Sequence, residues 1–124
     1  MREPFRDYSR HYGRVNTPPD MALMETRPEL FRIRAPWLPG DAQARVLDVG
    51  CGWGWLLARL WVSGYRNIQG VDVSRDMCAV ARDSLPQEIP IVCADALQHL
   101  RGMTHEFDLL TVFDLIEHLS LIHI

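Results

Sequence analysis

The segment that decides the fold is residues 45–54, RVLDVGCGWG. Its apolar run, residues 45–49, is typical of a buried strand, and it ends directly at three alternating glycines. Glycines let the backbone turn tightly and approach a ligand closely, and the N–H groups that open the next helix suit a carboxylate or a phosphate. The segment therefore predicts a strand, a tight turn and a helix, with the turn either binding a ligand or serving only as a connection.

The alternation of strand and helix continues along the chain. Further strands are predicted at residues 67–73, 89–93 and 107–113, and helices at 53–63, 75–85, 95–100 and 115–119. Strands that alternate with helices form a parallel sheet with helices on both faces. The fold class is therefore α/β, and its ligands are expected beyond the carboxyl ends of the strands.

Composition excludes several classes of protein. The chain has 124 residues, of which 48% are hydrophobic and 23% are charged, as expected for one globular domain. No apolar run approaches the roughly 20 residues that span a membrane, and the net charge of −3 gives no drive toward nucleic acid. Three cysteines without a C-x-x-C pair argue against a disulfide framework or a zinc cluster. We therefore expect a cytoplasmic protein with reduced thiols and neither a membrane nor a nucleic acid as its partner.

The chain is expected to divide into three parts. Residues 1–44 are predicted to form an N-terminal helical or lid segment, in which Asp20 caps a helix and Pro28 breaks it. Residues 45–119 form the core, and residues 120–124 are expected to be a tail. Because residues 119–124, LSLIHI, are what a sequencing-adapter string encodes, we interpret that tail as an artefact; the alternative is a genuine short apolar tail.

An acidic residue ends the second strand. Asp72 lies 22 residues beyond Gly50, where an acid binds ribose hydroxyls, although a turn or capping role is the alternative. In a dinucleotide fingerprint the last glycine would occupy the position of Trp55, and here the third glycine falls one residue earlier, at Gly54. This spacing favours a ligand with adenosine and an amino-acid carboxylate but no pyrophosphate. An NAD-dependent oxidoreductase or epimerase, and a non-catalytic nucleotide-binding module, remain as alternatives.

Four motifs together resemble a known family. Residues 46–54 resemble the first motif of class I S-adenosylmethionine-dependent methyltransferases, and residues 70–74, 93–96 and 107–119 are similar to the next three in order. The Glu-His-Leu ending is similar to the ubiquinone-biosynthesis-type and general small-molecule methyltransferases. The resemblance implies a Rossmann-like three-layer sandwich in which this chain carries strands in the order 3-2-1-4 and is truncated before the remaining strands. It also implies direct methyl transfer from S-adenosylmethionine to an O, N or C nucleophile of an unidentified small molecule.

The resemblance further implies a set of cofactor-binding residues. Asp48 would lie near the amino group of the methionine part, Asp72 would bind both ribose hydroxyls, and Asp95 would accept from the adenine amine. Met77 would lie against the adenine or belong to the core, and Phe113 would lie beside the reacting methyl group. The complete predicted set is Asp48, Gly50, Cys51, Gly52, Gly54, Asp72, Val73, Met77, Asp95, Ala96 and Phe113.

The end of the chain supplies a candidate base and a candidate interface. His118 is the candidate general base, with helix capping or packing as the alternative role. We expect no metal, because Asp114 replaces the first glutamate of the Glu-x-x-Glu-His pattern found in metal-binding relatives. The strand at 107–113 would form an unpaired apolar edge, which predicts a homodimer or aggregation through that strand. We expect the 124-residue chain alone to be marginally stable and to transfer no methyl groups.

Overall fold

The computed structural model describes residues 17–103 and 106–112, which contain five helices and four strands. The elements are α2 (Met21–Thr26), α3 (Pro28–Phe31), β1 (Val46–Val49), α4 (Trp55–Val62), β2 (Ile68–Asp72), α5 (Arg75–Ser84), β3 (Ile91–Cys93), α6 (Ala96–Leu100) and β4 (Leu109–Thr111). The helix predicted at 115–119 lies outside the described residues. The other strands and helices predicted for the core form where the periodicity placed them, with ends shifted by a few residues.

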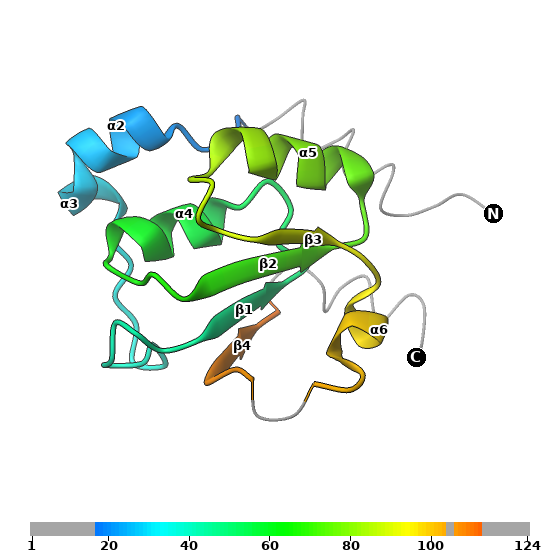
Figure 1. Ribbon diagram of the computed structural model, residues 1–124. Helices are drawn as coiled ribbons and strands as arrows, with labels where there is room; N and C mark the ends of the chain where they lie inside the picture. The colour runs from blue at the N-terminus through cyan, green and yellow to red at the C-terminus, as the bar shows by residue number, and fades with distance from the viewer. Residues whose placement is uncertain (1–16, 104–105, 113–124) are drawn as a thin grey trace.

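The four strands form one parallel sheet in the order β3-β2-β1-β4, which confirms the predicted order. The register pairs Val46 with Ile68 of β2 on one side and with Leu109 of β4 on the other. Gly70 of β2 pairs in turn with Ile91 of β3. Figure 1 shows the resulting layers, with α4 and α5 on one side of the sheet and α6 on the other. The chain is thus an α/β sandwich of the expected class.

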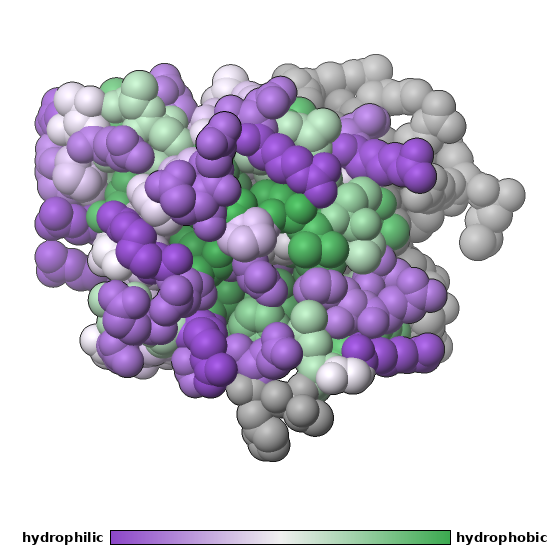
Figure 2. Space-filling model, in the orientation of Figure 1, coloured by the Kyte–Doolittle hydropathy of each residue, from purple (hydrophilic) through white to green (hydrophobic). Residues whose placement is uncertain are grey.

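Alternate residues of β1 face two separate hydrophobic clusters. Val46 packs into the larger cluster, which α4 and α5 cover. Leu47 and Val49 face the smaller cluster on the side of α6. On this second side Leu110 of β4 keeps 48% of its surface exposed. In Figure 2, apolar residues gather near the middle of the face, around the place of β2 and β3, and hydrophilic residues surround them.

The N-terminal segment packs onto α4 as two short helices rather than one. Asp20 caps α2 by accepting a hydrogen bond from Leu23 N at 3.1 Å, and Pro28 starts α3 as expected. Met24 is fully buried, whereas Leu30 is 63% exposed. Met24 and Leu30 therefore do not share one apolar face, because the break before Pro28 interrupts the helical spacing.

An ion pair fixes the start of β4 beside the start of β1. Asp108 Oδ2 accepts from the backbone N–H of Arg45 at 2.8 Å, and Asp108 N donates to the Arg45 carbonyl at 2.8 Å. The Arg45 guanidinium lies 3.4 Å from Asp108 Oδ1. The Arg45 backbone N–H and guanidinium hold the pKa of Asp108 below its ordinary value of 3.8. This clamp sets the register that the two strands keep toward their carboxyl ends.

We predict that Asp108→Asn lowers the thermal unfolding midpoint at neutral pH. Folding lowers the pKa of Asp108, so the ionised carboxylate stabilises the folded state at pH values above 3.8. This stabilisation is lost as the pH falls through the folded-state pKa. Thermal unfolding of both proteins at a series of pH values from neutral into the acid range checks this, and the difference between the two midpoints should shrink as the pH falls below 3.8. Asp83→Asn, at an exposed position of α5, is the control. A difference between wild type and Asp108→Asn that stays constant with pH would contradict the clamp.

Candidate functional site

The carboxyl ends of β1 and β2 are joined through the glycine-rich turn, residues 50–54. Gly50 N and Cys51 N both donate to the Val71 carbonyl, at 2.8 and 3.1 Å. Ala94 N, just after β3, donates to the Asp72 carbonyl at 2.9 Å. The segments that follow the first three strands therefore meet at one edge, as expected for a parallel sheet.

The turn has a backbone that only glycine adopts easily. Gly52 and Gly54 have φ values of +58° and +90°, in the region that L side chains avoid. Gly54 ends the turn as the residue preceding α4, which explains why this helix begins at Trp55 and not at Trp53. A Cβ atom at Gly54 would lie 2.5 Å from Leu85 Cδ1. Gly54 is therefore required by packing against the end of α5 as well as by its φ angle.

Asp72 connects the turn to the beginning of α5. Its Oδ2 accepts from Gly52 N at 2.9 Å, and its Oδ1 accepts from Ser74 N at 2.8 Å. Ser74 Oγ caps α5 by accepting from Met77 N at 3.3 Å. Asp72 thus takes the turn role that the sequence left open, and it does so directly beside the glycine turn. A carboxylate accepts about four hydrogen bonds, so these two backbone N–H groups do not by themselves saturate it.

A buried polar pair lies at the ends of β1 and β4. Asp48 and Thr111 are each 4% exposed, and Thr111 Oγ1 donates to Asp48 Oδ1 at 2.7 Å. The two residues are partners in the strand register. Sequence reasoning singled out Asp48 but missed Thr111. The feature of the sequence that indicates Thr111 is a lone hydroxyl residue in an apolar strand. The strand register places this residue opposite a buried acid.

Two of the predicted cofactor residues have core side chains. Cys51 is 6% exposed, and its Sγ lies only 2.7 Å from the position that a Cβ at Gly70 would occupy. Burial raises the pKa of the Cys51 thiol well above its usual range, and the carboxylates of Asp48 and Asp72 raise it further. The Met77 side chain is buried, with Cε 3.4 Å from the position of a Cβ at Gly52. Cys51 can therefore offer only its backbone to a ligand, and Met77 supports the turn from beneath.

The remaining predicted residues follow β2 and β3 or lie further along the chain. Val73 is half-buried directly after β2. Asp95 is exposed, and its Oδ1 caps α6 by accepting from Gln98 N at 3.1 Å. Ala96 packs against the smaller hydrophobic cluster. Phe113 and His118 lie outside the described residues.

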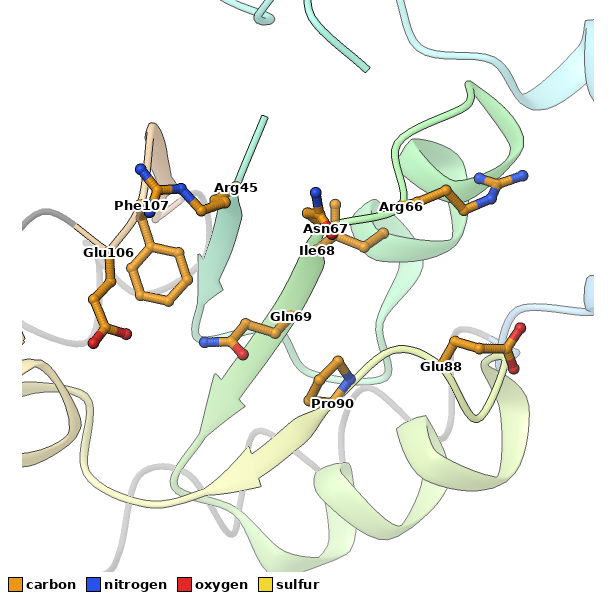
Figure 3. A pocket seen from close by; sticks show the side chains of 9 residues that line it. All are labelled: Arg45, Arg66, Asn67, Ile68, Gln69, Glu88, Pro90, Glu106 and Phe107. Carbon is orange, nitrogen blue, oxygen red and sulfur yellow. The ribbon is translucent and has the colours of Figure 1, made fainter. Parts of the chain in front are cut away.

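A hollow of about 400 Å³ lies at the opposite, amino edge of the sheet. Its lining residues, shown in Figure 3, are Arg45, Arg66, Asn67, Ile68, Gln69, Glu88, Pro90, Glu106 and Phe107. They precede or begin strands, whereas the glycine turn follows one. The lining carries arginines and glutamates together, and Arg45 is already paired with Asp108. The hollow is therefore separate from the edge where Asp48, Asp72 and the glycine turn meet.

The described part of the chain contains neither a cluster of metal-binding side chains nor a helix that could span a membrane. Within residues 17–103 and 106–112, no group of three or more His, Cys, Asp or Glu side chains is placed to hold a metal ion. No helix in those ranges is both long and apolar enough to cross a membrane.

Comparisons with known proteins agree with this geometry. A family model described as a methyltransferase domain matches residues 46–123. The chain is similar to the solved structure of an S-adenosylmethionine-dependent methyltransferase from Mesorhizobium loti, with 34% identity, 60% of this chain and 35% of that chain covered, and a TM-score of 0.54. No curated protein matches the chain.

Two further solved structures share the fold. The [4+2]-cyclase SpnF is 27% identical, with 73% of this chain and 32% of that chain covered and a TM-score of 0.51. The bifunctional kinase-methyltransferase WbdD is 18% identical, with 82% and 22% covered and a TM-score of 0.55, which shows the fold alone. The chain spans about a third or less of the length of these three structures.

Proposed function

Because the chain belongs to the methyltransferase domain family, we propose that it binds S-adenosylmethionine at the carboxyl edge of its sheet and takes part in methyl transfer to a small molecule. The contact that best supports this proposal is the hydrogen bond from Gly52 N to Asp72 Oδ2, at 2.9 Å. It places an acid suited to ribose hydroxyls beside a turn that brings backbone N–H groups close to a ligand. The proposed cofactor-binding unit is the core that begins at residue 45.

The donor and acceptor chemistry of the site fits this cofactor. Asp72 is proposed to accept from the ribose hydroxyls, and Asp48 to accept from the amino group of the methionine part. Gly50, Gly52 and Gly54 would let the backbone approach that part, and Cys51 would contribute its backbone alone. A side chain at Gly52 would strain the turn, since φ is +58° there, and its Cβ would lie 3.4 Å from Met77 Cε.

The adenine is proposed to lie beyond the ends of β2 and β3. Val73 and Ala96 would border it, and the Asp95 carboxylate would accept from its amine while capping α6. Met77 would support the adenine only through its contact with the turn, because its side chain is 2% exposed. These assignments follow the family resemblance, and the positions at one edge of the sheet support them.

Chemistry at the methyl group needs little from the protein. S-adenosylmethionine, when bound, supplies a sulfonium methyl group that an O, N or C nucleophile can attack directly. The chain would therefore supply alignment and exclusion of water. His118 is proposed as the base that takes the proton of the nucleophile, and Phe113 as a neighbour of the methyl group.

Calorimetric titration of the 124-residue chain with S-adenosylhomocysteine and with NAD tests the proposed function. We expect S-adenosylhomocysteine to bind and NAD not to bind. Gly54 packs against Leu85 and leads directly into Trp55, whose indole Nε1 donates to the Thr17 carbonyl at 2.8 Å. The turn thus lacks the later glycine that makes room for a pyrophosphate. Binding of NAD without S-adenosylhomocysteine would overturn the proposal.

A second function, cofactor binding without methyl transfer, is favoured by one observation. The chain is 27% identical to SpnF, a [4+2]-cyclase, over 73% of its own length. Incubation with S-adenosylmethionine and a panel of phenols, amino sugars and carboxylic acids separates the two functions. Formation of S-adenosylhomocysteine with any acceptor would support methyl transfer and overturn the second function.

We also propose where the protein is located and which partners it has. Cys51, Cys78 and Cys93 are free thiols, which supports a cytoplasmic location. β4 is one of the two edge strands of the described sheet and exposes Leu110, which supports a homodimer through this strand. The substrate is proposed to be a small molecule and not a nucleic acid. Sedimentation of the wild type and of Leu110→Lys checks the dimer, which the lysine should weaken.

We predict that Gly52→Val lowers the affinity for S-adenosylhomocysteine by more than about tenfold. A β-branched residue at a φ of +58° costs about 1–3 kcal/mol of strain, and relief of that strain would move Gly52 N away from Asp72. Calorimetry checks the affinity, and circular dichroism checks that the fold is kept. Gly40→Val is the control, because a Cβ at Gly40 has nothing within 4 Å. Unchanged affinity in a folded Gly52→Val protein would remove the turn from the site.

A further inference from the structure

We propose that Thr111 is a positioning residue: its hydroxyl orients the buried Asp48 carboxylate toward the amino group of the bound cofactor. This inference rests on the proposed function. Thr111 is the last residue of β4, and Asp48 is its register partner in β1. Both side chains are 4% exposed, so the geometry between them is protected from competing water.

The direction of the hydrogen bond follows from the groups involved. An ionised carboxylate only accepts, whereas a threonine hydroxyl has a single proton to donate. Two acceptors lie near Thr111 Oγ1, Asp48 Oδ1 at 2.7 Å and the Leu47 carbonyl at 3.5 Å. The shorter distance is typical of a bond from a hydroxyl to a charged oxygen. The proton of Thr111 therefore points to Asp48.

The neighbour of Asp48 on the other side offers no side-chain donor. Its register partner in β2 is Gly70. The space over this glycine is taken by Cys51 Sγ and Leu57 Cδ1, at 2.7 and 2.8 Å from the position of a Cβ. On the β4 side Thr111 thus supplies a hydroxyl donor to Asp48, whereas on the β2 side Cys51 and Leu57 cover the glycine that is its register partner. Thr111 is placed to select the rotation of the carboxylate, and with it the direction of the oxygen that would meet an ammonium group.

The clamp between Arg45 and Asp108 keeps this pair in register. It ties the chain just before β1 to the chain just before β4, with Arg45 N 2.8 Å from Asp108 Oδ2. From there each strand runs three residues to the pair, Asp48 on β1 and Thr111 on β4. The position of Thr111 relative to Asp48 is therefore set by contacts at the opposite end of the strands, before any ligand arrives.

Two ligands separate a positioning role from a structural one. S-adenosylhomocysteine carries the amino-acid part, and 5′-methylthioadenosine has the same adenosine and a thioether but lacks the amino-acid part with its amino group. Thr111→Val keeps the shape and removes the hydroxyl, so it should weaken S-adenosylhomocysteine binding about tenfold and leave 5′-methylthioadenosine binding nearly unchanged. Thr111→Ser keeps the hydroxyl and should retain the wild-type ratio of the two affinities.

Calorimetric titration measures the affinity of each variant for the two ligands, and thermal unfolding shows whether the variant is folded. An unchanged ratio in Thr111→Val, or an equal loss for both ligands, would overturn the positioning role. If Thr111→Val does not fold, the ratio in Thr111→Ser decides alone, and a fall of that ratio would overturn the inference. A wild-type chain that binds 5′-methylthioadenosine and S-adenosylhomocysteine equally well would also overturn it. A folded wild-type chain that binds neither ligand would instead overturn the proposed function on which the inference rests.

Discussion

Replacing Gly54 with alanine is expected to destabilise the chain by about 2–6 kcal/mol, because two costs add. A non-glycine residue at a φ of +90° costs about 1–3 kcal/mol. The new Cβ would also lie 2.5 Å from Leu85 Cδ1, and overpacking of this kind typically costs about 1–3 kcal/mol. Domains of this size have a free energy of unfolding of only about 5–15 kcal/mol. Denaturant unfolding measures the loss.

Two matched variants separate the costs. Gly102 has a similar φ of +81°, and a Cβ there has nothing within 4 Å, so Gly102→Ala should show the backbone cost alone. In a Leu85→Ala background, the cost of Gly54→Ala should fall toward that of Gly102→Ala. An equal cost for Gly54→Ala in both backgrounds would mean that Leu85 does not constrain the turn.

Replacing Asp72 with alanine is expected to weaken binding of S-adenosylhomocysteine by about 1–3 kcal/mol, roughly five- to 150-fold. The proposed ribose hydroxyls would lose their acceptor. Gly52 N and Ser74 N would lose theirs as well, at 2.9 and 2.8 Å, so the turn itself would loosen. Calorimetric titration of the variant and the wild type measures the change.

A second acid gives the control for this prediction. Asp83→Ala removes an exposed carboxylate from α5 and should leave the affinity unchanged. Asp72→Asn keeps the shape and one acceptor oxygen, and its affinity should lie between those of the wild type and Asp72→Ala. An Asp72→Ala variant that binds as tightly as the wild type would exclude Asp72 from the site.

The sequence predicts the sheet well because its signals are local. The apolar run at Val46–Val49 and the cap Asp20 each act within a few residues, and the structure places the strand and the helix accordingly. The family resemblance, drawn from four motifs in order, is confirmed by the match over residues 46–123. The exact start of α4 was missed, because it depends on the left-handed conformation of Gly54 and not on the apolar pattern.

The sequence predicts less of the site because several roles depend on contacts between distant residues. Spacing placed Asp72 near the glycine turn but could not show that it bonds to both Gly52 N and Ser74 N. Gly54 was interpreted through the ligand, whereas Leu85, far along the chain, supplies the packing reason. Thr111 gained its significance only when the register placed it opposite Asp48.

The central claim is that the glycine turn at the carboxyl edge, and not the hollow at the amino edge, receives the cofactor. Amide ¹H–¹⁵N spectra of the chain, recorded during titration with S-adenosylhomocysteine, test it most directly. We expect the amide signals of Gly50, Gly52 and Gly54 to shift in a saturable way, while those of Asn67 and Gln69 in the hollow stay in place. Saturable shifts at Asn67 and Gln69 with an unchanged glycine turn would contradict the account.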